Sequence, residues 1–395
     1  MSYNLQTYIE RSLAAKLRWS LANFPVTALV GPRQCGKSTL ARQVVKKIPS
    51  VLFIDLEKPS DLRKLDDAEF FFQVQKEKLI CIDEIQKKPE LFPLLRVMVD
   101  EDRRPGRFLI LGSASPELIR QGSETLAGRI HFLELTPFTY NELTEIDSFN
   151  STDLSLIWIR GGFPESVLAA DELVSLTWRT DFIRTFLERD IPQFGFSIPA
   201  TTMRRFWSMM AHYHGQVFNA SKLGQSLGVT HPTIRKYLDI MEQTYMVRVL
   251  LPLAANVKKR LVKSPKIYIR DSGILHALLE IRNIDDLLGH PVAGASWEGW
   301  CLEQIITEMP DWRPYYYRTS SGEEIDLILE RGRRRLAFEF KASMSPKVSR
   351  GFSATRKLLQ PEQTWIVAPV QTGYPHSQDV TVANIGEVLH ALRLL

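Results

Sequence analysis

A glycine-rich segment near the start of the chain has the residue spacing of a phosphate-binding loop. Residues 31–38 have the sequence GPRQCGKS, which fits G-x-x-x-x-G-K-[ST] and stands between an apolar run and a helical pattern. In that setting backbone N–H groups surround a phosphate, the lysine neutralises it, and the hydroxyl binds Mg²⁺. We therefore expect ATP and Mg²⁺ as cofactors, with Ser38 on the metal, in a loop formed by Gly31, Pro32, Arg33, Gln34, Cys35, Gly36, Lys37, Ser38 and Thr39.

Further polar residues follow two later apolar runs, and an arginine precedes a third. Asp83 and Glu84 end one run, and we expect Asp83 to hold Mg²⁺ and Glu84 to polarise the attacking water. Such carboxylates can also be plain helix caps, but their position after a phosphate loop favours catalysis. Ser113 or Ser115 could contact the γ-phosphate or simply form a turn. Arg129 could reach the γ-phosphate of a neighbouring subunit or form a surface salt bridge.

A second set of charged residues lies near the end of the chain. Two predicted strands join at the turn 331–334, and this hairpin would bring Asp326, Glu339 and Lys341 together. Two carboxylates can hold Mg²⁺, and an adjacent lysine can orient water against a phosphodiester. Glu298, on a preceding helix, could add another carboxylate. The alternative is a solvated salt bridge, which is the usual role of a lone E-x-K on a strand.

Most of the excess positive charge is concentrated in the middle of the chain. Residues 201–270 contain twelve Lys or Arg and two Asp or Glu, whereas the whole chain carries a net charge of +5. The segment 219–238 has the spacing of a helix-turn-helix, and two later apolar runs complete the pattern of a winged helix. DNA is the favoured partner, although winged helices also serve as protein contacts. The residues expected to contact DNA are Thr233, Arg235, Lys236, Lys258, Lys259 and Arg260.

These side chains require several ordered elements to position them. The early apolar runs are continuous, as in strands buried on both faces, and predict an α/β domain with a mostly parallel sheet. The predicted strands are Thr27–Val30, Val51–Asp55, Leu79–Asp83, Phe108–Leu111 and Ile130–Leu135. We expect a nucleotide-binding core over 1–140, a helical lid over 141–195, the winged helix over 200–270 and a second α/β domain over 271–395.

The composition agrees with a multidomain globular protein. The 395 residues are 44% hydrophobic and 24% charged, which excludes a mostly disordered chain. No apolar run approaches the roughly 18 residues needed to span a bilayer, and the N-terminus lacks the pattern of a signal peptide. Three dispersed cysteines favour neither a disulfide framework nor a metal knuckle. We expect a cytoplasmic protein without membrane contacts.

The order of these motifs resembles that of AAA+ ATPases. The segments GPRQCGKS, LAGR at 126–129, LTPF at 135–138 and RGGFP at 160–164 are similar to a bacterial and archaeal family that joins an AAA-type ATPase to an uncharacterised C-terminal domain. The resemblance implies strand order 5-1-4-3-2, a small helical lid, and a homo-oligomer such as a hexameric ring, with Arg129 as a trans-acting arginine.

The C-terminal domain in turn resembles the PD-(D/E)XK nuclease fold. Asp326, Glu339 and Lys341 match its motif, and Glu298 matches its helical glutamate. We therefore predict an α/β protein with an AAA+ P-loop domain, a winged helix and a nuclease-like domain. It would hydrolyse ATP to move or remodel branched or broken DNA, with endonuclease activity as an addition. The alternatives are a nucleotide-gated switch resembling STAND ATPases, with a degenerate nuclease domain that binds protein, and a transcription factor with an attached ATPase.

Overall fold

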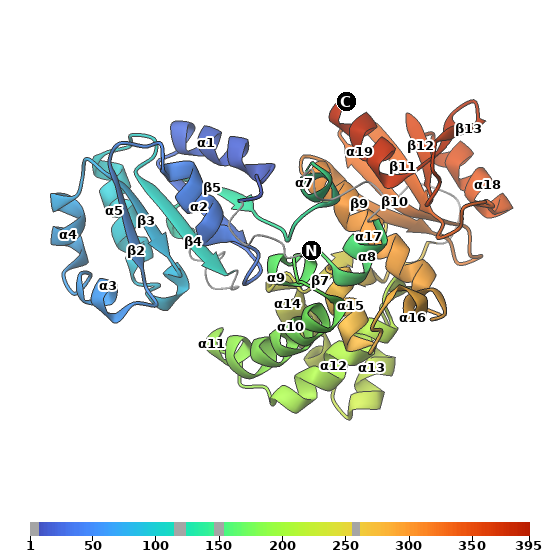
Figure 1. The fold of residues 1–395 in the computed structure, drawn as a ribbon, viewed down its shortest axis with the longest axis horizontal. Helices are drawn as coiled ribbons and strands as arrows, with labels where there is room; N and C mark the ends of the chain where they lie inside the picture. Colours follow the sequence, from blue (N-terminus) through green and yellow to red (C-terminus); the bar gives the residue numbers. More distant parts are fainter. Residues whose placement is uncertain (1–7, 114–123, 146–153, 255–260) are drawn as a thin grey trace.

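The computed structural model describes residues 8–113, 124–145, 154–254 and 261–395. Figure 1 shows three parts: a first region in blue on one side of the molecule, and a green to yellow middle region and a red C-terminal region on the other. We use these names for residues 8–138, 154–288 and 293–395. Within the described ranges, no helix is long and apolar enough to cross a membrane.

The first region is a parallel sheet covered by helices. Its strands follow the order β2-β3-β4-β1-β5, all parallel, which confirms the expected order 5-1-4-3-2. Every residue of β1 is buried, as the continuous apolar run predicts. The elements are α1 (Leu13–Asn23), β1 (Val26–Gly31), α2 (Lys37–Val45), β2 (Val51–Asp55), α3 (Pro59–Arg63), α4 (Ala68–Val74), β3 (Leu79–Asp83), a 3₁₀ turn (Ile85–Lys87), α5 (Leu91–Glu101), β4 (Phe108–Ser113) and β5 (Ile130–Glu134).

The middle region is mostly helical and contains one small sheet of order β6-β8-β7. A single hydrophobic core runs from Phe163 to Leu275, so the helices that follow the first region pack together with the helix-turn-helix segment. The elements are α8 (Leu154–Arg160), α9 (Pro164–Val167), α10 (Glu172–Thr185), a π-helical turn (Phe186–Asp190), α11 (Ile191–Gln193), α12 (Ala200–His212), β6 (Gln216–Val217), α13 (Ala220–Leu227), α14 (His231–Gln243), β7 (Val247–Leu250), β8 (Lys266–Ile269), α15 (Ser272–Leu278) and α16 (Ile284–Leu288).

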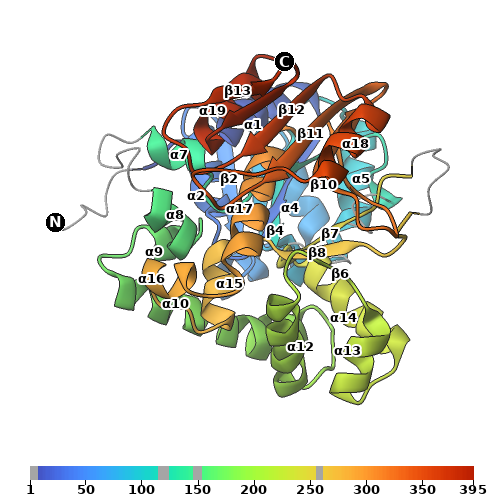
Figure 2. The same ribbon diagram turned by 90° about the vertical axis from the view of Figure 1, so that its right-hand side faces the viewer.

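The C-terminal region is a six-stranded mixed sheet of order β13-β14-β12-β11-β10-β9. The β10–β11 hairpin turns at Gly332, as predicted, and β11 and β12 are parallel because α18 crosses between them. Figure 2 shows this sheet at the top, with β7 and β8 of the middle region beside it. The elements are α17 (Ala293–Glu308), β9 (Arg313–Arg318), β10 (Glu324–Arg331), β11 (Arg334–Phe340), α18 (Arg350–Leu359), β12 (Gln363–Val367), β13 (Tyr374–Ser377), β14 (Val380–Ala383) and α19 (Ile385–Arg393); α7 (Tyr140–Thr144) lies against α19.

One predicted strand face is wrong. Regular alternation of faces along β10 predicts that Ile325, Leu327 and Leu329 share one core face. Leu327 and Leu329 do share one core, but Ile325 packs with Ile328 in a second core under α18. The register between β10 and β9 shifts between Ile325 and Ile328, and such an irregularity reverses the alternation of faces.

A junction of two glycines joins the first and middle regions. The backbone N–H of Phe138 donates to the carbonyl of Gly162 at 2.7 Å, and a Cβ at Gly162 would lie 2.2 Å from the carbonyl oxygen of Phe138. Gly161 has a positive φ of 74°, and Asp271 fills the space beside it. The motifs LTPF and RGGFP therefore hold the two regions against each other.

Candidate functional site

The phosphate loop connects β1 to α2 as the sequence predicts. Gly31 and Gly36 have positive φ angles of 151° and 97°, and a Cβ at Gly31 would lie 2.2 Å from the carbonyl oxygen of Leu135. The buried ammonium of Lys37 donates to the carbonyls of Gly31 and Pro32 at 3.2 and 2.7 Å. The Lys37 ammonium is thus directed into the loop, where a phosphate would bind.

Asp83 and Glu84 stand at the end of β3 beside this loop. Burial raises the pKa of Asp83, although the hydroxyl of Ser38 donates to its carboxylate and opposes that rise. A hydroxyl and a carboxylate in contact are oxygen ligands that Mg²⁺ prefers, so Ser38 and Asp83 fit this ion. Burial also raises the pKa of Glu84, and the nearby Lys37 lowers it. Glu84 has a left-handed backbone with φ of 57° directly after the last residue of β3.

Lys37, Ser38 and Glu84 open on a cleft between the first and middle regions. The cleft has a volume of about 750 Å³ and is large enough for a nucleotide. The loop and Glu84 line one side, while Pro164, Leu168 and Arg189 of the middle region line the other. A bound nucleotide would therefore contact both regions.

An ion-pair cluster crosses the same cleft. Arg33 of the loop pairs with the buried Asp190 of the π-helical turn, and its second pairing with Glu57 measures 3.3 Å. Arg189 lies 3.5 Å from Glu57 and links the middle region to the same cluster. Burial raises the pKa of Asp190, and Arg33 opposes the rise. Arg33 was expected in the loop, but no local pattern indicates Asp190 as its partner, since the two residues are distant in sequence.

A second arginine, Arg11, was missed altogether. Its guanidinium is buried and donates to the carbonyls of Cys35 at 2.9 Å and Thr136 at 2.6 Å. It also lies 3.1 Å from the carboxylate of Glu142. Arg11 thus fixes the phosphate loop to the segment that leaves the sheet, which no local pattern indicates.

The other residues predicted for the nucleotide site are Ser113, Ser115 and Arg129, and they lie in different surroundings. The backbone of Ser113 pairs with Gly31 across β4 and β1, so its position in the sheet is next to the loop. Ser115 lies outside the described residues. Arg129 forms two hydrogen bonds of 2.7 and 2.9 Å with Asp100, so the salt bridge that we considered is present. The arginine remains partly exposed at the surface.

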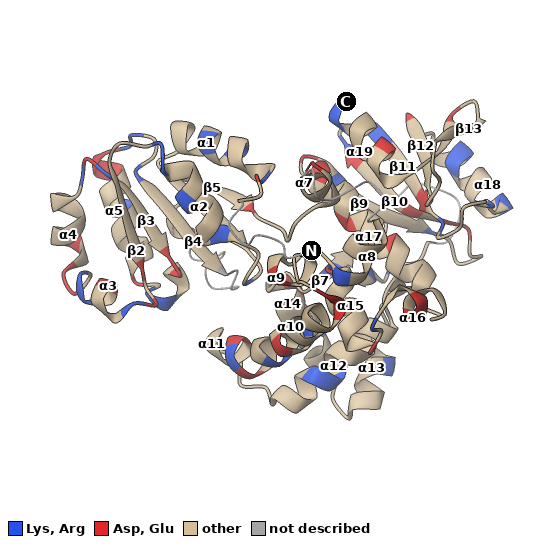
Figure 3. Cartoon of the chain, in the orientation of Figure 1, with Lys and Arg blue, Asp and Glu red and all other residues tan. Residues whose placement is uncertain are grey.

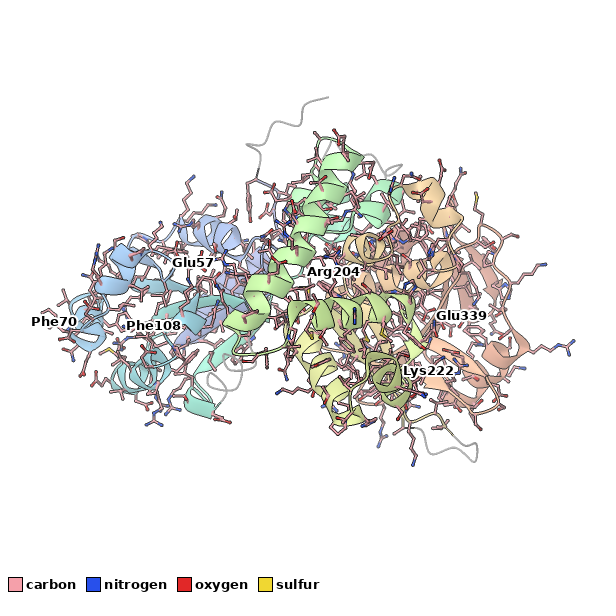
Figure 4. The ribbon with its side chains drawn as sticks, turned by 90° about the horizontal axis from the view of Figure 1, so that it is seen from below. Glu57, Phe70, Phe108, Arg204, Lys222 and Glu339 are labelled. Carbon is pink, nitrogen blue, oxygen red and sulfur yellow. The ribbon has the colours of Figure 1, made fainter. Side chains whose placement is uncertain are left out.

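The predicted DNA-contacting side chains are only partly described. Arg235 and Lys236 lie exposed on α14, whereas Thr233 bonds to the capping hydroxyl of Thr230 at 2.9 Å. Lys258, Lys259 and Arg260 lie outside the described residues. Figure 3 shows further basic positions in blue along α12, and Figure 4 labels Arg204 on α12 and Lys222 on α13, the side of the molecule seen from below.

Part of the middle region's positive charge faces inward. Arg270 pairs with Glu134 of the first region at 2.6 Å and with Glu303 of the C-terminal region at 3.1 Å. Arg248 also pairs with Glu303, and Lys266 is 3% exposed. Three of the twelve basic residues therefore tie the three regions together and are not available to a polyanion.

The C-terminal carboxylates do gather, but around a lysine that we did not predict. The ammonium of Lys266 on β8 lies 2.6 Å from Glu324, 3.0 Å from Glu298 and 3.7 Å from Asp326. The hydroxyl of Tyr268, two residues along the same strand, donates to Glu298 at 2.6 Å. Burial lowers the pKa of Lys266, but these carboxylates outweigh it and raise the pKa well above its ordinary value.

The hairpin brings the motif residues together as predicted. The carboxylate of Asp326 accepts from the backbone N–H of Phe340 at 3.0 Å, and Glu339 accepts from Lys341 at 2.7 Å. The second oxygen of Glu339 is buried and has no hydrogen-bond partner among the described residues. Burial and then Asp326 raise the pKa of Glu298 to about 7 and that of Glu339 to about 8.

The predicted metal ligands of this cluster do not fit a metal in the observed arrangement. Among the described residues, no group of three or more His, Cys, Asp or Glu side chains could hold a metal ion. Lys266 lies beside Asp326, where an ammonium repels a divalent cation. The assignment of Asp326 and Glu339 as metal ligands stays a prediction, and Lys266 lies 3.7 Å from Asp326 in the observed arrangement. Gly299 lies inside α17, which begins at Ala293, and the absence of a side chain there makes room for His214.

Three family models match successive parts of the chain. An AAA domain matches residues 23–144, and two domains of unknown function, DUF8612 and DUF4143, match residues 151–285 and 293–388. Among solved structures, the Walker-type ATPase paby2304 of Pyrococcus abyssi has a TM-score of 0.51 at 15% identity over 71% of this chain and 100% of its own. The fold and the nucleotide site thus define an ATPase of the AAA type with a P-loop.

A mycobacterial relative identifies the family. The uncharacterized protein Rv2008c of Mycobacterium tuberculosis is 44% identical over 379 residues, which cover 96% of this chain and 84% of the relative. An uncharacterized protein of Haemophilus influenzae is 24% identical over 278 residues, 63% of this chain and 68% of the relative. The chain belongs to the family of the mycobacterial protein.

Proposed function

We propose that this protein is a Mg²⁺-dependent ATP hydrolase that acts on DNA. The observation that carries the proposal is the convergence of Lys37, Ser38 and Glu84 at one cleft, with Asp83 hydrogen-bonded to Ser38. Lys37 would neutralise the β- and γ-phosphates, and Ser38 with Asp83 would hold Mg²⁺, which neutralises charge on the transferred phosphoryl group. Glu84 would accept the proton of the attacking water.

The cleft also supports a route from nucleotide state to movement. Its two walls belong to different regions, and Arg33 and Asp190 pair across it. Because Arg33 lines the same cleft as Lys37, loss of the γ-phosphate would change the charge that this arginine faces, and ATP and ADP would favour different arrangements of the two regions. In an oligomer, Arg129 would add a positive charge to a neighbour's γ-phosphate.

DNA is proposed as the object of that movement. The element order α12, β6, α13, α14, β7, β8 supports the proposal of a winged helix, and Arg235 and Lys236 on α14 are exposed. Their contacts would be mainly with phosphates, so binding would depend strongly on salt and little on sequence. Branched or broken DNA is the substrate that we favour.

The test compares ATP hydrolysis with and without duplex and branched DNA. The variant Arg235→Glu/Lys236→Glu should keep its basal rate and lose the stimulation by DNA, because two exposed charges on α14 are reversed. The matched control is Lys46→Glu/Lys47→Glu, an exposed basic pair at the far end of α2. Stimulation that survives in the first variant, or disappears equally in both, would contradict the assignment of α14.

The second candidate is a nucleotide-gated switch that binds a protein. The observation that favours it is the inward pairing of Arg248, Lys266 and Arg270, which makes the middle region a connector between the other two. A switch would hydrolyse ATP slowly and at the same rate with or without DNA. The same assay therefore separates the two functions.

The C-terminal region enters the proposal as a nuclease-like domain. Asp326 and Glu339 lie on adjacent antiparallel strands beyond the helix that carries Glu298, which is the order that we expected for that fold. No cleavage step is assigned to the arrangement described above, because Lys266 lies among the carboxylates.

A further inference from the structure

Three positive side chains converge on one carboxylate of the nucleotide cleft, that of Glu57, which is labelled in Figure 4. Its Oε1 atom lies 3.3 Å from Arg33 of the phosphate loop and 3.5 Å from Lys87 of the turn that follows Glu84. Arg189 of the π-helical turn approaches the same oxygen at 3.5 Å. The three cations therefore come from three separate elements, one of them in the middle region.

This cluster has an excess of positive charge. The side chain of Glu57 is 40% exposed, whereas that of Asp190, the other partner of Arg33, is 3% exposed. Among the described residues, Lys87 and Arg189 form no ion pair with another carboxylate. Three cations thus face two carboxylates, and like charges that close together repel one another. The site around the Glu57 oxygen therefore suits an anion of higher charge than a carboxylate.

The backbone places Glu57 next to the residues proposed for hydrolysis. The N–H of the residue before it donates to the carbonyl of Asp83 at 3.2 Å, and Glu84 follows Asp83 directly. Burial raises the pKa of Glu84, while Lys37 and then Arg33 lower it, so both cations lie close to this carboxylate. The cation cluster and the proposed general base thus share one cleft with the lysine of the phosphate loop.

We propose that Glu57 is a built-in substitute for the terminal phosphate of ATP. ATP displaces its carboxylate from Arg33, Lys87 and Arg189 and puts the γ-phosphate in its place, whereas ADP leaves these ion pairs intact. The inference rests on the proposed ATP hydrolase and adds the group with which ATP competes. It also gives ATP, and not ADP, a contact with the middle region through Arg189.

The test compares the binding of Mg²⁺ complexes of AMP-PNP, a non-hydrolysable ATP analogue, and of ADP to the full-length protein by isothermal titration calorimetry without DNA. Glu57→Gln keeps the shape of the side chain and removes its charge. The matched control is Glu165→Gln, which removes the charge of another exposed carboxylate that lines the same cleft. Thermal melts check that each variant is folded.

We expect Glu57→Gln to lower the Kd of AMP-PNP by at least about fivefold and to change the Kd of ADP by less than about twofold. The reason is that the cations lose a competing unit charge within about 4 Å, which is worth about fivefold in affinity even at the dielectric constant of water. Glu165→Gln should change neither Kd. The inference is overturned if Glu57→Gln leaves the ratio of the two Kd values unchanged, or if Glu165→Gln changes it equally.

Removal of a cation from the cluster should have the opposite effect. Arg189→Gln, at a position whose side chain is 54% exposed, should raise the Kd of AMP-PNP by at least about fivefold and leave that of ADP within about twofold. Arg184→Gln, at an exposed position in the last turn of α10, is the matched control and should change neither. An equal effect of Arg189→Gln on both nucleotides would overturn the inference.

The readout separates this inference from the proposed function, because it needs neither DNA nor hydrolysis. A wild type that binds neither nucleotide would refute the proposed hydrolase together with the inference. Nucleotide binding whose preference for AMP-PNP over ADP is the same in wild type and Glu57→Gln would refute the inference alone.

Discussion

Substitution of Glu84 by glutamine tests the chemistry of the nucleotide site most specifically. The carboxylate is largely buried, and burial raises its pKa towards the working pH, which improves a general base. The side chain of Gln86 donates to it. Glutamine has nearly the same shape and can accept the same hydrogen bond, so the change removes the proton-accepting ability and little else.

The size of the effect on kcat can be estimated because the substitution removes only the general base. A positioned general base contributes roughly 10²–10⁴-fold, equivalent to about 2.7–5.5 kcal/mol of transition-state stabilisation. Glu57, another carboxylate of the cleft, lies within 3.5 Å of three cations, Arg33, Lys87 and Arg189, and is poorly suited to replace the base. We therefore expect kcat of Glu84→Gln to fall by roughly 10²–10⁴-fold while ATP affinity stays within about threefold.

The assay combines steady-state phosphate release with equilibrium binding of a fluorescent ATP analogue. Glu90→Gln, an exposed glutamate six residues further along the chain, is the matched control and should behave as wild type. A kcat of Glu84→Gln within about tenfold of wild type would refute the assignment of a general base. An equal loss in both variants would indicate a general effect on folding.

Three further predictions concern the junction, the carboxylate cluster and the oligomer. Gly162→Ala should lower the free energy of unfolding by about 1–3 kcal/mol, because the added Cβ would lie 2.2 Å from a carbonyl oxygen. Gly294→Ala, where nothing lies within 4 Å of the added Cβ, should not lower it, and chemical denaturation measures both variants. The pKa of Glu339 is raised to about 8 in the folded protein, so the folded state retains a proton that the unfolded state loses, and stability should fall as pH rises from 5 to 8. Glu339→Gln should reduce that fall in thermal melts, and an identical pH dependence would contradict the pKa shift. If Arg129 acts in trans, Arg129→Ala should lower kcat by roughly 10³-fold or more in the oligomer, whereas a surface salt bridge alone predicts no change.

The nucleotide site could be predicted because its information is local. The strand, the glycine-rich turn and the helix start are contiguous, and Asp83 with Glu84 directly follows another continuous apolar strand. The strand order came from resemblance, because nothing in the apolar runs fixes which strands are neighbours. Arg11 and Asp190 were missed because their partners in the loop are distant in sequence.

The C-terminal cluster was predicted without its central cation. The spacing of Asp326, Glu339 and Lys341 on a hairpin was sufficient to bring them together. Lys266 reaches them only through the packing of two regions, which spacing does not encode. A signal was nevertheless present, because Lys266 and Tyr268 alternate with isoleucines on β8, and both contact Glu298. Two polar side chains on one face of a buried strand indicate a polar partner.

The net charge of the middle region was a poorer guide than the position of each residue. The excess predicted a polyanion-binding surface, yet Arg248 and Arg270 pair with the buried Glu303. These pairs hold the regions together and depend on acidic residues outside the counted segment. The DNA proposal therefore rests on the exposed Arg235 and Lys236 of α14 and not on the net charge of the segment.

The central claim is that ATP hydrolysis at Lys37 acts on DNA. The most direct measurement is the steady-state rate of phosphate release with Mg²⁺, with and without duplex DNA, for wild type and Lys37→Ala. We predict hydrolysis that DNA accelerates in the wild type and that is lost with and without DNA in the variant. A wild-type rate that DNA does not change would contradict the action on DNA, and hydrolysis that survives in Lys37→Ala would contradict the site itself.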